Sequence, residues 1–193
     1  MVVEGTAARL VGAAREIVVA EGSSAVTMRR VAVAVGVTPM ATYRHFPNRE
    51  ALLNEVATAC SAELGGLWGQ RSDIVDVEDR ITGLLEDFLD FALGTPHLYT
   101  FLMVERREHA RRFPEDFVGG ASPSFGRVTE AVEQGMREGV LRPGDALEVT
   151  LALTALGQGL ITMYLGGRIG LSEPDFRALC ARSVEKVLDG IKA

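Results

Sequence analysis

The sequence has few of the residues that build disulfides or metal sites. It contains two cysteines, Cys60 and Cys180, and three histidines, His45, His97 and His109, and they do not stand at metal-ligand spacing. The first residues lack the basic start and apolar core of a secretory signal, so we expect two buried thiols rather than a disulfide. No metal and no cofactor are expected.

Long hydrophobic runs are also scarce, although 47% of the 193 residues are hydrophobic and the mean hydropathy is +0.15. The segment 149–167 carries no charge and is near the length that spans a bilayer. It contains Thr150, Gln158, Tyr164 and four glycines, and no basic cluster flanks one side of it. We therefore predict a helix that protein buries, and no membrane partner.

Strands are missing from the pattern as well. No run alternates apolar and polar residues with a period of two, whereas apolar residues recur every three or four positions, as at Leu10, Ala14, Ile17 and Val18. Thr6 is expected to cap this first helix. The sequence predicts an all-α fold of about nine helices, without internal repeats.

Positive charge is in short supply, because 20 basic residues face 26 acidic ones and the formal net charge is −6. Taken alone, this total argues against DNA, whose phosphates attract positive surface. However, residues 1–50 carry six basic and four acidic residues, a net of +2, and residues 51–193 carry 14 basic and 22 acidic ones, a net of −8. The uneven distribution indicates a small positive module joined to a larger acidic one.

One stretch near the N-terminus has the pattern of two short helices joined by a tight turn. Thr27 and Thr38 are predicted N-caps, and Pro39 occupies the first position of the second helix, where its missing N–H is harmless. Gly36, between the helices, supplies the backbone freedom that a tight turn requires. Ala32 is small enough for two helices to cross closely. These features predict a helix-turn-helix motif.

A helix-turn-helix motif places its second helix in the major groove of DNA, while nearby cations and capping groups hold phosphates. The residues of this stretch suit that task, because they offer hydroxyls, cations and hydrogen-bond donors. These groups belong to Thr38, Tyr43, Arg29, Arg44, His45 and Arg49. Arg29 and Arg30 are adjacent on a short helix and cannot share a face, so one of them is expected to be only solvated.

The same stretch resembles the TetR family of transcriptional regulators over about residues 6–56. The resemblance rests on the pattern T-x-R-x-V-A-x-x-x-G-V-T-x-x-x-x-Y-x-H-F-x-N-R-x-x-L-L, above all on Gly36-Val37-Thr38, Tyr43, His45-Phe46 and Asn48-Arg49. Two positions depart from the family pattern. Arg49 stands where lysine is usual and should still meet a phosphate. Thr42 stands where an aliphatic residue is usual, so looser packing of the recognition helix is expected.

The resemblance implies an all-α homodimer with a DNA-binding domain at residues 1–56 and a ligand-binding and dimerisation domain at residues 57–193. It implies phosphate contacts from five side chains, those of Thr27, Thr38, Tyr43, His45 and Arg49. It also implies that base edges are read by four residues, Arg29, Pro39, Met40 and Arg44. For each of these residues the alternative is an ordinary structural or solvent-exposed role.

The C-terminal region predicts an effector site with less specific signals. Ligand sites are mostly apolar with a few polar contacts. Apolar lining is expected from Trp68, Phe91, Phe101 and Met136, and polar contacts from His97, Gln158 and Tyr164, with core or surface positions as the alternative for each. The helices at about 145–166 and 174–191 resemble the pair that forms the dimer interface in this family.

The sequence therefore predicts a cytoplasmic, ligand-responsive regulator that binds a palindromic double-stranded operator as a homodimer. Repression is the expected mode, with release by a small apolar or amphipathic effector. An enzyme is not expected, because acidic pairs such as Glu86 and Asp90 are typical of solvated helix faces and no nucleophile–base pair accompanies them. The remaining alternative is a TetR-like sensor or adaptor that acts through protein contacts without binding an operator.

Overall fold

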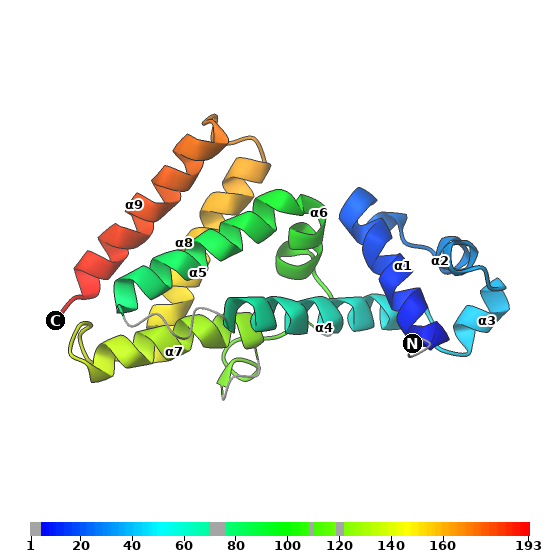
Figure 1. The fold of residues 1–193 in the computed structure, drawn as a ribbon, viewed down its shortest axis with the longest axis horizontal. Coiled ribbons are helices and arrows are strands. Elements are labelled where there is room, and N and C mark those ends of the chain that lie inside the picture. The colour runs from blue at the N-terminus through cyan, green and yellow to red at the C-terminus, as the bar shows by residue number, and fades with distance from the viewer. Residues whose placement is uncertain (1–4, 70–75, 109, 119–121) are drawn as a thin grey trace. The chain divides into compact units, whose positions relative to one another are not determined.

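The computed structural model describes residues 5–69, 76–108, 110–118 and 122–193 (Figure 1). Within these ranges the chain forms nine α-helices and no β-strand, which confirms the predicted fold class. The helices are α1 (Thr6–Glu21), α2 (Met28–Val35), α3 (Pro39–Tyr43), α4 (Arg49–Trp68), α5 (Val77–Gly94), α6 (Pro96–Tyr99), α7 (Pro123–Arg137), α8 (Ala146–Leu165) and α9 (Glu173–Ile191). Two shorter turns are η1 (Ser23–Ala25) and the π-helical η3 (Thr100–Val104). His109 lies outside the described residues.

The chain divides into two compact units. The first comprises residues 1–62 with residues 95–110, and the second residues 63–94 with residues 111–193. The domain boundary predicted at residue 56 falls inside α4, which continues to Trp68, so that boundary stays a prediction. Residues 95–110, which the sequence assigned to the ligand-binding domain, belong to the first unit, where α6 packs against α1.

In the first unit, α1 presents one apolar face to the interior. The buried residues of that face are Leu10, Ala14, Ile17 and Val18, as their spacing predicted. The prediction that Thr6 caps this helix is wrong. The cap position is held by Gly5 in extended backbone, and the Gly5 carbonyl oxygen accepts the N–H of Arg9, so Thr6 already lies in the first turn.

In the second unit, α5, α7, α8 and α9 pack against one another. Their interior is apolar, and its buried residues include Leu84, Leu89, Ala131, Val132, Leu153, Ile161, Phe176, Val184 and Leu188. Asp145 caps α8 by accepting the backbone N–H groups of Leu147 and Glu148, and Ser172 caps α9. Cys60 and Cys180 are both buried and form no disulfide, as expected.

Helix α8 corresponds to the uncharged segment noted in the sequence. Among the described helices it is the one that is long and apolar enough to cross a membrane by length and composition. One such helix is weak support for a membrane protein, because a helix covered by protein meets the same criteria. Its buried residues within the chain are Thr150, Leu153, Gly157 and Ile161, and its other residues are half-buried or exposed.

Candidate nucleic-acid interface

Helices α2 and α3 form a helix-turn-helix in the first unit (Figure 1). Each helix begins with the predicted cap: Thr27 Oγ1 accepts the N–H of Arg30 at 3.1 Å, and Thr38 Oγ1 accepts the N–H of Ala41 at 3.2 Å. Gly36 ends α2 in the left-handed region at φ +74°, a conformation that side chains with a Cβ rarely adopt. The caps and this turn fix the angle at which α3 leaves α2.

The contact between α2 and α3 is close and apolar. Val31 and Ala32 of α2 are fully buried, which fits the expectation that a small residue lets the helices cross. Thr42 of α3 is also fully buried, and its hydroxyl donates a 2.7 Å hydrogen bond to the Pro39 carbonyl oxygen. Because the hydroxyl has a partner, its burial carries no large desolvation cost. A threonine can therefore occupy this buried position of α3, where the family pattern usually has an aliphatic residue, because its hydroxyl is bonded within the helix.

The side chains predicted to meet DNA lie largely on the surface. Eight of them are exposed, namely Thr27, Arg29, Thr38, Pro39, Met40, Tyr43, Arg44 and His45. Met40 is 72% exposed and Tyr43 is 50% exposed, although both are large apolar or aromatic residues that a core would normally take. Exposure of such residues on a short helix is typical of a binding surface.

Arg29 and Arg30 differ in their surroundings. The Arg30 guanidinium forms a two-pronged pair with the Glu21 carboxylate at the end of α1, and this hydrogen bonding lowers the pKa of Glu21. The described part of the chain offers Arg29 no ion-pair partner. Arg30 is thus occupied within the unit, and Arg29 is the one available for an external anion.

Arg49 is tied to the protein backbone. Its Nε donates to the Val26 carbonyl oxygen at 2.9 Å, and its Nη2 donates to the Ser23 carbonyl oxygen at 2.6 Å. Its Nη1 lies 2.6 Å from the Glu50 carboxylate. These bonds join the start of α4 to the chain that leads into α2. The phosphate contact expected for Arg49 stays a prediction, and the structure gives this residue an internal role that the sequence did not indicate.

One exposed residue of the motif was missed from the sequence. Val33 is 74% exposed and lies one turn after Arg29 on the same face of α2. In the sequence it belongs to a run of valines and alanines that reads as helix core. Val31 and Val35 lie on the buried face of α2. Val33 is two residues from each of them, and on a helix this spacing could have predicted an exposed position.

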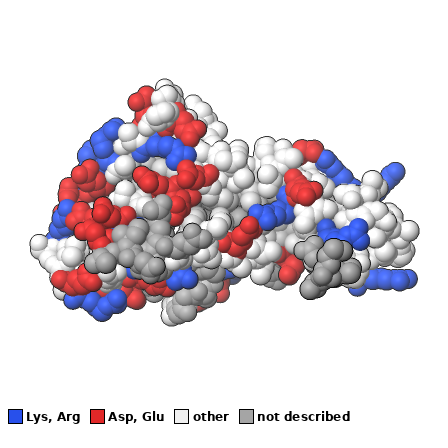
Figure 2. All heavy atoms as spheres, in the orientation of Figure 1, with Lys and Arg blue, Asp and Glu red and all other residues white. Residues whose placement is uncertain are grey.

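Charge is distributed as the sequence indicated. Figure 2 shows acidic side chains gathered over the helices of the second unit, while basic side chains project from the part that contains α1–α3. Arg29 and Arg44 are both exposed there. The helix-turn-helix therefore presents positive groups where DNA phosphates would be attracted.

The seven residues predicted to bind an effector are divided between the two units. Phe101 and His97 belong to the first unit, where Phe101 is buried with the Arg107 guanidinium 5.0 Å from its ring centroid, and His97 is exposed. In the second unit, Tyr164 stacks on Phe176 with ring centroids 4.0 Å apart. Met136 and Gln158 are half-buried.

Trp68 and Phe91 share a cluster with Phe88, which the prediction did not include. Trp68 is buried and meets Phe88 edge to face, with ring centroids 5.7 Å apart. Phe88 lies 6.3 Å from Phe91, one turn along α5. The structure thus brings together two of the seven predicted effector contacts, around a third aromatic ring.

Two family models match the chain. Residues 10–56 match the model for bacterial regulatory proteins of the tetR family, and residues 81–187 match the tetracyclin repressor-like C-terminal domain. A curated relative, the nucleoid occlusion factor SlmA of Photobacterium profundum, is 30% identical over 155 residues, which cover 75% of this chain and 76% of that relative.

Two solved structures show the same fold. A Rhodococcus sp. RHA1 protein of unknown function superposes with a TM-score of 0.81 at 20% identity, covering 100% of this chain and 98% of that one. The transcriptional regulator FadR of Bacillus subtilis, in complex with stearoyl-CoA, superposes with a TM-score of 0.75 at 14% identity, covering 95% of this chain and 98% of that one.

The helix-turn-helix, its exposed cations and the separate helical unit define a ligand-responsive, DNA-binding transcription regulator. The chain belongs to the tetR family of bacterial regulatory proteins. Members of this family are regulators rather than enzymes.

Proposed function

We propose that this protein is a cytoplasmic repressor that binds a palindromic operator as a homodimer and leaves it when an effector binds. The observation that carries the proposal is the exposure of Met40, Tyr43 and Arg44 at α3 together with that of Arg29 on α2. A two-fold dimer would place two such faces in successive major grooves, roughly 34–36 Å apart.

Contacts within each half-site follow from the position of each group. We assign phosphate contacts to the capping hydroxyls of Thr27 and Thr38, to Tyr43 and to His45. Base edges are assigned to Arg29, Pro39, Met40 and Arg44. Arginine gives specific contacts to guanine, and apolar groups suit the thymine methyl.

Dimerisation is proposed through α8 and α9. Helix α8 exposes an apolar row at helical spacing that includes Ala152, Ala155 and Gly159, with Leu151 38% exposed and Met163 43% exposed. Small residues let a second helix approach closely, and burial of this row would remove apolar surface from water. Such a contact would also account for the exposed, uncharged part of α8 that follows Glu148.

The effector is proposed to bind in the second unit. It would favour a dimer in which the two helix-turn-helix motifs no longer fit successive major grooves. Such coupling requires only that the effector prefer one state, and linkage then requires that operator DNA weaken effector binding by the same factor. FadR, which shares the fold, is described with stearoyl-CoA, and this supports an amphipathic effector for the present protein.

A second candidate function comes from the curated relatives, which are named nucleoid occlusion factors. It would use DNA binding for nucleoid occlusion rather than for the control of single promoters. A genome-wide map of bound sites separates the two functions. Repression is supported by a few sites next to promoters whose transcripts rise when the gene is deleted, and the second function by many dispersed sites without such a response.

The direct experiment is a fluorescence-anisotropy titration against the DNA that flanks the protein's own gene. Specific binding that weakens as salt rises is expected, because phosphate contacts release counterions. Arg44→Ala should weaken binding by about 1–3 kcal/mol per subunit, while Arg137→Ala on α7 serves as a matched control. Arg137 is 68% exposed and lies in the second unit. Absence of specific binding to any such fragment would contradict the proposal.

A further inference from the structure

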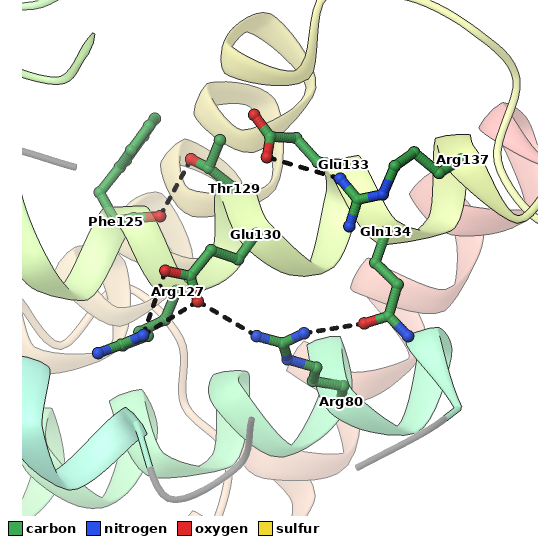
Figure 3. Close-up of polar contacts among 8 residues, drawn as sticks. All are labelled: Arg80, Phe125, Arg127, Thr129, Glu130, Glu133, Gln134 and Arg137. Atoms are coloured by element: carbon green, nitrogen blue, oxygen red, sulfur yellow. Dashed lines mark hydrogen bonds and ion pairs between the residues drawn. The ribbon is translucent and has the colours of Figure 1, made fainter. Parts of the chain in front are cut away.

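Arg80 of α5 is a buried cation without a full set of partners. Its side chain is only 8% exposed, and its Nη1 donates to Gln134 Oε1 of α7 at 2.9 Å (Figure 3). Its Nη2 reaches Glu130 Oε2 at 3.3 Å, which is long for a charge-assisted bond. Its Nε is buried and has no hydrogen-bond partner. A buried N–H in this state costs free energy that a suitable acceptor would recover.

The charges around Arg80 do not balance. The Glu130 carboxylate also accepts two bonds from Arg127 Nη1, at 3.0 and 3.1 Å, so two guanidiniums share one carboxylate. Gln134, the other partner of Arg80, is neutral and donates its amide N–H to Glu138. Glu133, on the same helix, is occupied by Arg137 at 3.9 Å (Figure 3). We call Arg80, Arg127, Glu130 and Gln134 the Arg80 cluster; its net charge is positive.

The part of Arg80 that lacks a good partner is its Nε–Nη2 edge. Two parallel N–H groups on one edge of a guanidinium match the two oxygens of a carboxylate. Glu130 meets only one of them, and weakly. Glu130 is 49% exposed and also bonded to Arg127, so it can give up Arg80 to another carboxylate and remain paired with Arg127.

The same side of α5 continues with apolar residues beyond Arg80, of which Leu84 is buried and Phe88 and Phe91 are half-buried. Leu84, Phe88 and Phe91 follow Arg80 at intervals of four, four and three residues, which places them on one side of the helix. Trp68 packs on Phe88. The axial distance from Arg80 to Phe88 is about 12 Å at the rise of an α-helix. A charged head at Arg80 and an apolar body toward Phe88 therefore fit one elongated molecule.

We propose that Arg80 binds the carboxylate of the effector, and that the effector is an amphipathic monocarboxylate whose apolar body lies along α5 toward Phe88. This inference rests on the proposed effector response and specifies its chemistry. Glu130 acts as an internal competitor that occupies Arg80 until a ligand carboxylate takes its place there.

Matched acid and ester probes test the proposal on the full-length protein. Decanoate and 4-phenylbutanoate are titrated against their methyl esters, with Trp68 fluorescence and the melting temperature as readouts, because Trp68 is the only tryptophan. Each acid is expected to bind at least tenfold more tightly than its ester. Equal binding of acid and ester, or no binding of either acid at millimolar concentration, would overturn the proposal.

Two substitutions separate a ligand contact from a structural bridge. Arg80→Gln should weaken acid binding at least tenfold and leave ester binding unchanged. Glu130→Gln should strengthen acid binding several-fold, because the competing carboxylate is gone; a purely structural role for the Arg80 cluster predicts no such gain. Glu133→Gln, on the same helix and half-exposed, is the control and should change neither.

Operator binding is measured in the same samples, so that the two proposals fail separately. If wild-type protein binds its operator and decanoate does not release it, the carboxylate effector is wrong and the repressor stands. If no operator is bound but acids bind through Arg80, the repressor is wrong and the carboxylate site stands. Unchanged acid binding in both Arg80→Gln and Glu130→Gln would overturn the site itself.

Discussion

Two arginines at the helix-turn-helix differ in what their guanidinium groups already do. Arg44 ends α3, is exposed, and has no ion-pair partner among the described residues. Arg49 already donates three hydrogen bonds within the protein, to Val26, Ser23 and Glu50. Residue type and family pattern alone predict DNA contacts for both, whereas their bonding shows that Arg49 also joins the start of α4 to the chain before α2 and that Arg44 has no such internal role in the described part of the chain.

The salt dependence of operator binding distinguishes these two roles. Replacement of Arg44 by Met should lower the slope of log affinity against log salt by about one per contact, and so by about two per dimer. Replacement of Arg49 by Met should weaken binding while the slope stays as in the wild type, because a positioning residue releases no counterion. Anisotropy titrations over a series of KCl concentrations measure both, and a lower slope for the Arg49 variant would support its predicted phosphate contact.

Cys180 provides a second test at the residue scale. Burial raises the pKa of its thiol to about 11, although the charge of nearby Arg177 acts in the opposite direction. Because the thiolate is the reactive form, a pKa raised from 9.0 to about 11 leaves roughly 100-fold less of it at pH 8. Iodoacetamide at pH 8 should therefore modify Cys180 in urea but hardly in the native protein.

Mass spectrometry of the alkylated peptides follows Cys180 separately from Cys60. Labelling of native Cys180 should increase as the pH is raised from 8 toward 11. Rapid labelling at pH 8 under native conditions would show that the thiol is neither buried nor shifted.

Helices were easier to predict than the bonds between them. The spacing of apolar residues located α1, and the Thr38-Pro39 and Glu173-Pro174 pairs marked the beginnings of α3 and α9. The π-helical turn η3 was not predicted, because nothing in Thr100–Val104 distinguishes it from α-helix. The Arg80 cluster was also missed, since Arg80 lies 50 and 54 positions from Glu130 and Gln134, the two residues that it bonds, and a spacing rule cannot relate them.

Close packing of α7 gives an element-scale prediction. A Cβ placed on Gly135 would lie 2.8 Å from Leu141 Cγ and 2.9 Å from Val77 Cγ1, and Leu141 is fully buried. Gly135→Ala should therefore destabilise the protein by about 1–3 kcal/mol through overpacking, despite the better helix propensity of alanine. Denaturant unfolding measures the change.

Gly12 of α1 is the matched control, because a Cβ there would meet nothing within 4 Å. Gly12→Ala should stabilise the protein by roughly 0.5–1 kcal/mol, the ordinary gain inside a helix. Stabilisation by both substitutions would mean that α7 and Leu141 are less closely packed than the structure has them.

At the scale of the whole molecule, the exposed row of α8 leads to a prediction about assembly. A second copy that covers this row should give a species of twice 20.7 kDa by light scattering. Ala155→Glu introduces a charge into the proposed interface and should yield monomers with weakened operator binding. Ala62→Glu, at an exposed position of α4, should leave the mass unchanged.

At the scale of the whole molecule, the uneven distribution of charge could be predicted from the sequence, whereas the assignment of residues 95–110 to the first unit could not. The totals of +2 for residues 1–50 and −8 for the remainder need only counting. The membership of residues 95–110 in the first unit depends on the packing of α6 against α1, which joins residues about 80 positions apart. The family pattern, confined to the N-terminal stretch, carries no information about that contact.

The exposed apolar face of α8 also bears on how the regulator responds to its own abundance. If DNA recognition needs two chains, then below the dimer dissociation constant the amount of the binding-competent form grows with the square of chain concentration, so doubling expression quadruples it. Modest changes in synthesis or turnover would then produce a steep change in promoter occupancy. The strength of the contact at α8 would thus set the expression level at which the switch engages.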